Sequence, residues 1–244
     1  MLEQFPGPLL GAFILALVFA LGIRITVGGR HPRRWISLAA GISVAYVFVD
    51  LLPELAARQA DIARVLGHNV LFAEKRLYLL ALIGFVIFYG LDHMVLRSRH
   101  LEGRESLAGT MDYVFWLHIG GFAFYCWIIG YLIKGLAERG APSLIMFVIA
   151  MALHFSVADH ELRNEHKQAY DRLGRWIMAA GTLLGSIVSL AAPLSEINVS
   201  RLLALVAGGV VIVSAVSELP KEKEGRFWWF VLGAAFYAIV ILLI

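Results

Sequence analysis

Residues 111–133, MDYVFWLHIGGFAFYCWIIGYLI, form a run of apolar, aromatic and small residues in which Asp112 and His118 are the only acidic or basic side chains. A bilayer core takes about 20 mostly apolar residues of helix, so this run predicts a membrane-spanning helix. The whole chain has the same character: 60% of its 244 residues are hydrophobic, 16% are charged, and the mean hydropathy is +0.77. Soluble domains are less apolar and more charged. The composition therefore excludes a water-soluble enzyme.

Short polar connections separate seven further runs of this kind, and none is long enough for a soluble domain. We therefore predict an all-α polytopic membrane protein in which residues 1–244 form one domain of eight transmembrane helices. The first run has neither a basic segment before it nor a cleavage pattern after it, so we expect a retained span. Cys126 is the only cysteine, which excludes a disulfide scaffold. The predicted spans are about 9–25, 35–55, 77–96, 111–133, 143–161, 173–194, 202–219 and 227–244.

Positive charge is unevenly shared among the connections. The connections after the first, third, fifth and seventh runs hold 14 of the 21 Lys and Arg residues. Because cytoplasmic connections are rich in Lys and Arg, these four are predicted to be inside and both termini outside. The net charge of +3 thus reflects membrane topology, and no nucleic-acid partner is expected. The compact connections indicate a bacterial inner membrane.

A motif recurs in the second and seventh runs. Ala40-Gly41 is followed by Asp50-Leu-Leu-Pro-Glu54, and at the same spacing Ala207-Gly208 is followed by residues 217–221, Ser-Glu-Leu-Pro-Lys. The two runs should cross in opposite directions, which predicts an inverted-repeat bundle with a substrate site near the midplane. The alternative is that each Leu-Pro pair ends a helix, since proline lacks an N–H group.

Histidines at membrane depth are candidate metal ligands, because ionisable groups there are costly. His118 in the fourth run and His154 in the fifth lie about seven residues from the same predicted membrane face, so they can share a depth. Neutral imidazole suits zinc, iron, copper or nickel. Asp159 and His160 follow on the fifth run as further candidate ligands. The alternative is that each histidine makes an ordinary interhelical hydrogen bond.

Carboxylates mark two ends of a predicted cation pathway. His154, Glu161 and Glu165 follow a helical spacing that puts them on one face, leading from the midplane toward the cytoplasm. Asp50 and Glu54 flank Pro53 at the outer end of the second run, where they can attract cations. The alternative in both places is a solvated helix end with local ion pairs.

With these residues in view, the chain resembles the ZIP family of divalent-metal transporters along all eight runs. The resemblance implies eight spans with both termini outside, and a divalent cation (zinc, iron or manganese) as substrate without an organic cofactor. The segments that carry it are Gly41 through Asp50-Leu-Leu-Pro-Glu54, Gly84-Phe85 through Leu91-Asp92-His93, Leu117-His118 with Gly120-Gly121, and Ala152-Leu153-His154.

The chain also departs from the family pattern. In the fourth run Ile119 and Phe122 stand where the family has Asn and Asp, and in the fifth run Phe155 and Ala158 stand where it has Glu and His. The resemblance thus implies the fold more strongly than a two-metal centre of the usual composition. We expect a ZIP-like permease, not an enzyme, that moves a divalent cation inward through a reduced histidine site.

Two other functions stay open. Large apolar side chains in place of ligands would suit a ZIP-fold sensor or partner subunit that no longer transports. Ser156 and His160, four residues apart on one helical face, would suit a zinc-dependent intramembrane hydrolase. Besides the lipid bilayer and the cation, a homodimer is a candidate partner, because Gly181 and Gly185 form a small-residue pattern that can pack against a neighbouring helix or a second protomer.

Overall fold

The computed structural model describes residues 6–27, 32–66, 75–101, 108–214 and 227–243, and this part of the chain contains helices and no strand. The predicted all-α fold is thereby confirmed. Two short π-helical turns interrupt the α-helices: η1 (Val47–Leu51) and η3 (Tyr170–Gly174). The α-helices are α1 (Pro6–Val27), α2 (Pro32–Tyr46), α3 (Leu52–Leu66), α4 (Arg76–Leu101), α5 (Ala108–Glu138), α6 (Ala141–Ala169), α7 (Arg175–Ala191), α8 (Glu196–Val213) and α9 (Phe227–Leu243).

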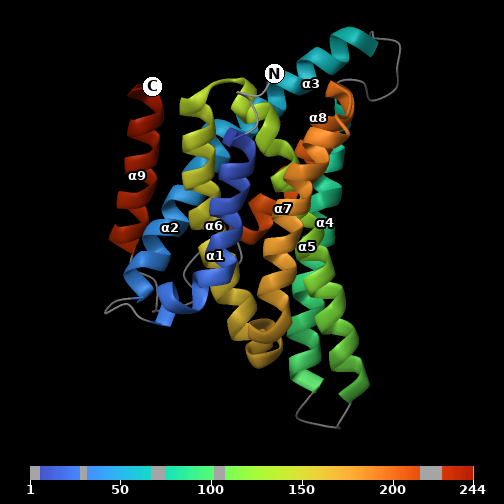
Figure 1. The fold of residues 1–244 in the computed structure, drawn as a ribbon, viewed down its shortest axis with the longest axis vertical. Helices are drawn as coiled ribbons and strands as arrows, with labels where there is room; N and C mark the ends of the chain where they lie inside the picture. Colours follow the sequence, from blue (N-terminus) through green and yellow to red (C-terminus); the bar gives the residue numbers. More distant parts are fainter. Residues whose placement is uncertain (1–5, 28–31, 67–74, 102–107, 215–226, 244) are drawn as a thin grey trace.

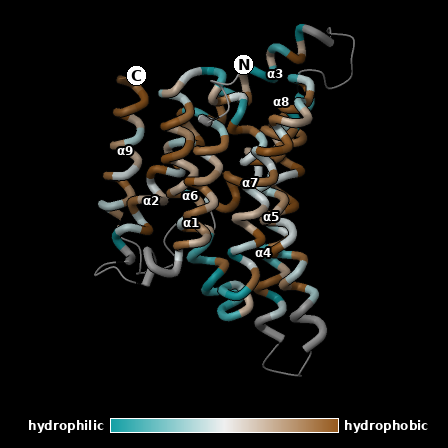
Figure 2. The backbone as a smooth tube through the Cα atoms, viewed as in Figure 1, coloured by the Kyte–Doolittle hydropathy of each residue, from teal (hydrophilic) through white to brown (hydrophobic). Residues whose placement is uncertain are grey.

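The helices form a bundle with an apolar outer surface (Figures 1 and 2). Large apolar side chains are exposed along outward faces, for example Leu82 and Val86 on α4 and Leu232 and Phe236 on α9. A soluble monomer rarely exposes so much contiguous apolar surface. The protein is therefore an integral membrane protein whose outer surface meets lipid. Among the residues that the structure describes, five helical stretches are long and apolar enough to cross a bilayer, namely Arg34–Arg64, Arg76–Ser98, Tyr113–Glu138, Ala141–Ala191 and Glu196–Val213; the shorter apolar helices there are Gly7–Gly22 and Phe227–Leu243.

The stretch Ala141–Ala191 contains a change of direction. Lys167 has φ 45° and ψ −120°, values outside the helical region, and η3 follows directly. The chain turns there, so that α6 and α7 both pack against α1 (Figure 1). Each of the eight predicted runs thus overlaps a helix, although the end of the seventh run at residue 219 lies outside the described residues.

Pro53 does not end the second helix. The chain continues helically from α2 through η1 into α3 as far as Leu66. Proline cannot donate a backbone hydrogen bond and its ring crowds the preceding turn. The wider π turn of Val47–Leu51 lies immediately before it and gives the ring room. The interpretation of Leu-Pro as a helix end is therefore wrong for Leu52-Pro53, while Leu219-Pro220 lies outside the described residues.

Close packing of α2 against α9 depends on two glycines. A Cβ atom on Gly41 would lie 2.0 Å from the carbonyl oxygen of Phe230, and one on Gly233 would lie 2.2 Å from that of Leu38. Small residues allow helix backbones to approach closely in membranes. Both glycines are therefore required by this crossing.

The crossing of α4 with α8 repeats this arrangement. A Cβ atom on Gly208 would lie 1.8 Å from the carbonyl oxygen of Ala81, and one on Gly84 would lie 2.1 Å from that of Leu205. In both crossings, each glycine faces the carbonyl oxygen of the residue three positions before the glycine of the other helix. Gly41 and Gly208, which belong to the repeated motif, therefore play the same part in their two crossings. Residues 217–221, the second half of the repeated motif, lie outside the described residues.

Gly181 and Gly185 lie at a helix contact within the chain. Cβ atoms there would lie 2.8 Å from the carbonyl oxygen of Ala123 and 2.0 Å from that of Trp127, so the pattern packs α7 against α5. The small-residue pattern that suggested a homodimer thus has an intramolecular partner.

Candidate functional site

Two polar cavities lie near opposite ends of α6. The first, which we call the histidine cavity, has a volume of about 20 Å³, enough for one water molecule. Elements α4, α5, α6 and α8 contribute its walls. Its lining residues are Phe88, Asp92, His118, Phe122, Ala158, Glu161, Leu162, Glu165, Ile212 and Val213.

His118 lies at the centre of a group of three metal-competent side chains. Its Nδ1 atom is 2.8 Å from Nε2 of His166 and 3.6 Å from a carboxylate oxygen of Glu165. The potential ligand atoms of the three residues all lie within 4.8 Å of one another. His118 is buried, and the other two side chains are largely so. α5 thus supplies one imidazole, and the last turns of α6 supply a second imidazole and a carboxylate.

These separations suit a transition metal. Tetrahedral zinc bound at 2.0–2.1 Å by nitrogen and oxygen holds its ligand atoms about 3.3 Å apart. The hydrogen bond between the two imidazoles requires that one ring nitrogen carry a proton. If that proton moved to the other nitrogen of its own ring, both facing nitrogens would present lone pairs to a cation, and binding would require only a small separation of the two rings. Three protein ligands leave a fourth position open, which favours exchange over permanent retention.

His154 has different neighbours from His118. Its Nε2 atom is hydrogen-bonded to the hydroxyl of Tyr125 at 2.9 Å, and the imidazole is fully buried. Aromatic rings connect the two histidines: His118 contacts Phe122, Phe122 contacts Tyr125, and Tyr125 contacts His154. The structure therefore joins His118 to His166, and His154 to an aromatic layer.

Asp159 is engaged by an arginine. Arg163 donates two hydrogen bonds to its carboxylate, at 3.0 and 2.8 Å, and the Tyr170 hydroxyl donates a third at 2.7 Å. A Cβ atom on Gly22 would lie 2.2 Å from this carboxylate, so α1 packs directly over it. A cation bound by Asp159 would have to displace the guanidinium group of Arg163. His160 is partly buried beside it and is not in the three-residue group.

Glu161 and Glu165 both line the histidine cavity with Ala158, as their shared helical face predicts. Ser156 donates its hydroxyl hydrogen to the Ala152 carbonyl of its own helix at 2.7 Å, instead of to His160. The catalytic pair imagined for a hydrolase is therefore not assembled in this structure.

The second cavity, which we call the arginine cavity, has a volume of about 180 Å³ and lies beside η1 and the first turns of α6. Asp50 lines it and accepts a hydrogen bond of 2.5 Å from the hydroxyl of Tyr237 on α9. Leu132, Met146 and Phe147 are among its apolar walls.

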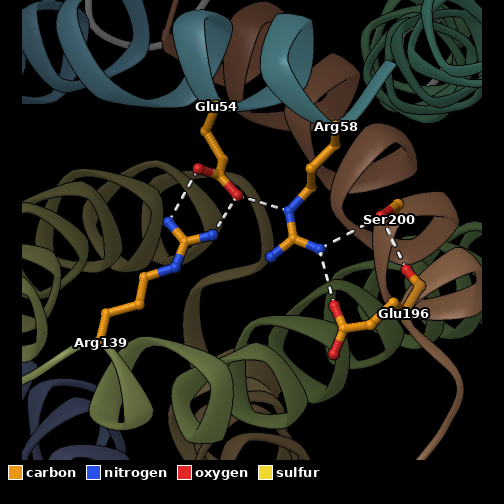
Figure 3. Close-up of polar contacts among 5 residues, drawn as sticks. All are labelled: Glu54, Arg58, Arg139, Glu196 and Ser200. Carbon is orange, nitrogen blue, oxygen red and sulfur yellow. Dashed lines mark hydrogen bonds and ion pairs between the residues drawn. The ribbon is translucent and has the colours of Figure 1, made fainter. Parts of the chain in front are cut away.

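Glu54 also lines this cavity, and its carboxylate is ion-paired with two arginines (Figure 3). Arg139, in the turn between α5 and α6, binds both of its carboxylate oxygens, one of them at 2.8 Å. Arg58, one turn further along α3, also donates to Glu54. The hydrogen bonds with Glu54 raise the pKa of Arg139 above its ordinary value. Glu54 is thus occupied by guanidinium groups.

Sequence reasoning left His166 and Asp92 out of the predicted site. His166 lies beyond the predicted end of the fifth span at residue 161, whereas α6 continues to Ala169. The sequence suggests that Asp92 lies at a solvated helix end, whereas in the structure it lines the histidine cavity. The sequence feature that could have predicted His166 is the helical spacing of Glu161 and Glu165, because it indicates that the helix and its polar face continue past residue 161.

Comparisons with known proteins give no identification: no family model matches the chain, and no curated protein matches it.

Proposed function

We propose that this protein is a ZIP-like secondary permease that carries a divalent transition-metal cation such as zinc, iron or manganese into the cytoplasm. The observation that supports it is the group of His118, Glu165 and His166 at the histidine cavity. His118 is buried and Glu165 and His166 are partly buried, and ionisable side chains inside a membrane bundle are costly, so they mark candidate functional sites. Imidazole with carboxylate suits first-row transition metals better than magnesium or calcium.

The proposed pathway joins the two cavities. A cation reaches the arginine cavity beside Asp50, passes the aromatic layer when the helices move, and is held by His118, Glu165 and His166. Glu161 and Asp92, which also line the histidine cavity, compensate its charge. The repeated crossings of α2 with α9 and of α4 with α8 support an inverted repeat, whose halves would rock against each other. Both termini would then face outside.

This pathway modifies the metal site predicted from the sequence. His118 keeps its role as a ligand, and His166 with Glu165 takes the place foreseen for His154. Asp159 and His160 are not used as ligands, because Arg163 and Tyr170 already satisfy the Asp159 carboxylate.

The test combines cation binding with cation uptake. Purified protein is titrated with Zn²⁺, Fe²⁺ and Mn²⁺ by calorimetry, and the same protein is reconstituted into vesicles loaded with a metal-sensitive dye. We expect His118→Ala and His166→Ala each to weaken binding at least about tenfold and to abolish uptake. His93→Ala is the matched control, since this histidine is exposed and stacks on Tyr89. Uptake that persists in both variants would refute the proposed pathway.

A second candidate is a ZIP-fold sensor that holds a metal without moving it. The observation in its favour is the packed layer of Phe88, Phe122 and Tyr125, with Phe88 in contact with both other rings. Binding that depends on His118 and His166, with no uptake of any cation by the unmodified protein, would establish this candidate instead of the permease.

A further inference from the structure

Glu54 is the centre of an ion-pair network that joins three parts of the bundle (Figure 3). It lies on α3 and binds Arg139 of the α5–α6 turn through both carboxylate oxygens. Arg58, also on α3, binds Glu54 and donates on to Glu196 at 3.4 Å and to the Ser200 hydroxyl at 3.2 Å, both on α8. Bidentate arginine–carboxylate pairs are among the stronger ion pairs. The network therefore ties α3 down on two sides.

α3 is joined to α2 through a stretch of backbone at which helices commonly bend. The π turn η1, Val47–Leu51, separates it from α2, and Pro53 removes one backbone hydrogen bond in its first turn. Kinks in helices occur at π turns and at proline. From this joint α3 extends away from the bundle toward Leu66 (Figure 1). A small change of angle at η1 thus moves Glu54 and Arg58 relative to α6 and α8.

The arginine cavity lies beneath this contact. Glu54, Arg58 and Arg139 form one part of its wall, while Met146 of α6 and Leu203 of α8 line it deeper in the bundle. With side-chain exposures of 25% for Glu54 and 19% for Arg58, the pair is partly shielded from solvent. Separating Glu54 from Arg139 would remove part of the wall.

We propose that Glu54, Arg58 and Arg139 form a latch that holds α3 over the arginine cavity, and that breaking the latch lets α3 pivot at η1 and opens the cavity to water. The latch belongs to the fold, and it rests on the proposed function only for the identity of the cargo, a divalent cation. It assigns to Glu54 the task of gating, whereas the sequence predicted that Glu54 attracts cations to the outer end of the second run.

The experiment measures access to the cavity without any metal or flux. Met146→Cys places a thiol on the cavity wall, and its reaction with a charged methanethiosulfonate reagent is followed in detergent-solubilised protein. The native Cys126 is buried and sets the background. We expect Glu54→Gln to accelerate modification of the residue 146 thiol about tenfold, because the neutral amide loses the charge that binds both arginines. Arg139→Gln should act in the same direction.

A double variant tests whether the two residues act as one unit. Glu54→Gln with Arg139→Gln should react no faster than the faster single variant, since each removes the same pair. Asp61→Asn is the matched control, because it breaks an exposed pair with Arg64 on the same helix at 3.0 Å. Cys126 should stay unreactive in Glu54→Gln without the added thiol, which separates local opening from unfolding.

An unchanged rate in both single variants, or an equal acceleration by Asp61→Asn, would overturn the latch. Because the thiol reaction involves no cation, that outcome leaves the permease proposal standing. Conversely, uptake that survives in the His118 and His166 variants would refute the proposed pathway and leave the latch intact.

Discussion

His118 and His154 look equivalent in the sequence, since each is a single imidazole inside an apolar helix. Their surroundings differ: His118 meets the ionisable side chains of His166 and Glu165, whereas His154 meets the Tyr125 hydroxyl and aromatic rings. Position along a helix gives depth in the membrane, but the rotation of each helix about its axis depends on packing. Sequence alone could therefore put both histidines at one depth and still not say which groups they face.

Substitution of the two histidines should have opposite consequences. His154→Ala leaves a buried cavity and an unsatisfied Tyr125 hydroxyl, so we expect the free energy of unfolding to fall by about 2–4 kcal/mol. Zinc affinity should stay within about threefold, because His154 is not in the three-residue group. His118→Ala should weaken zinc binding much more. Thermal unfolding in detergent and calorimetric titration measure the two effects, and equal loss of zinc affinity in both variants would contradict the assignment.

At the scale of helices, the hydrophobic runs predicted where helices form, but they did not predict where each helix ends. All eight runs overlap helices because an apolar segment of that length has few alternatives in a bilayer. The sequence placed the end of the fifth span at Glu161, where polar residues begin, yet the helix continues because its ion pairs satisfy those residues. That extension supplies Glu165 and His166. His166 was therefore missed because it lies in the part of α6 beyond the apolar run.

The glycine crossings predict a strong sensitivity to a single methyl group. Gly41→Ala and Gly208→Ala should each lower the free energy of unfolding by about 1–3 kcal/mol, since the new Cβ atom would meet a carbonyl oxygen of the partner helix. Gly120→Ala is the control, because nothing lies within 4 Å of a Cβ atom there. Thermal unfolding of the three variants checks this. A control as unstable as the other two would show that helix propensity or lipid contact, not the crossing, sets the effect.

The turn at Lys167 predicts a stabilising glycine. With φ 45° and ψ −120°, Lys167 adopts a sparsely populated backbone conformation that costs an L-residue about 1–3 kcal/mol and costs glycine little. We expect Lys167→Gly to raise the unfolding temperature. Gln168→Gly, at the next helical position, should lower it, since glycine in a helix is about 1 kcal/mol less favourable than other residues. Destabilisation of similar size in both variants would contradict the strained turn.

For the whole molecule, the two cavities divide the bundle along α6. Pro142 and Met146, near its start, line the arginine cavity, and Ala158 and Glu165, near its end, line the histidine cavity. The aromatic layer of Phe122 and Tyr125 lies next to the second. The proposed permease would use this arrangement for alternating access, with one cavity open at a time and the packed rings moving between the two states.

This arrangement predicts which end of α6 faces the cytoplasm. Arg163 near the end of α6, Lys167 at the turn and Arg172 in η3 are positively charged, and positive charge is retained inside. Ser143 and Gln168 are exposed near the two ends of α6, so each can carry a single reporter thiol. We expect Ser143→Cys to react with a membrane-impermeant maleimide in intact bacterial cells, and Gln168→Cys to react only after the membrane is permeabilised. The unmodified protein is the control, since Cys126 is buried. If Gln168→Cys reacted in intact cells and Ser143→Cys only after permeabilisation, the histidine cavity would face outward. That result would contradict the proposed direction of transport.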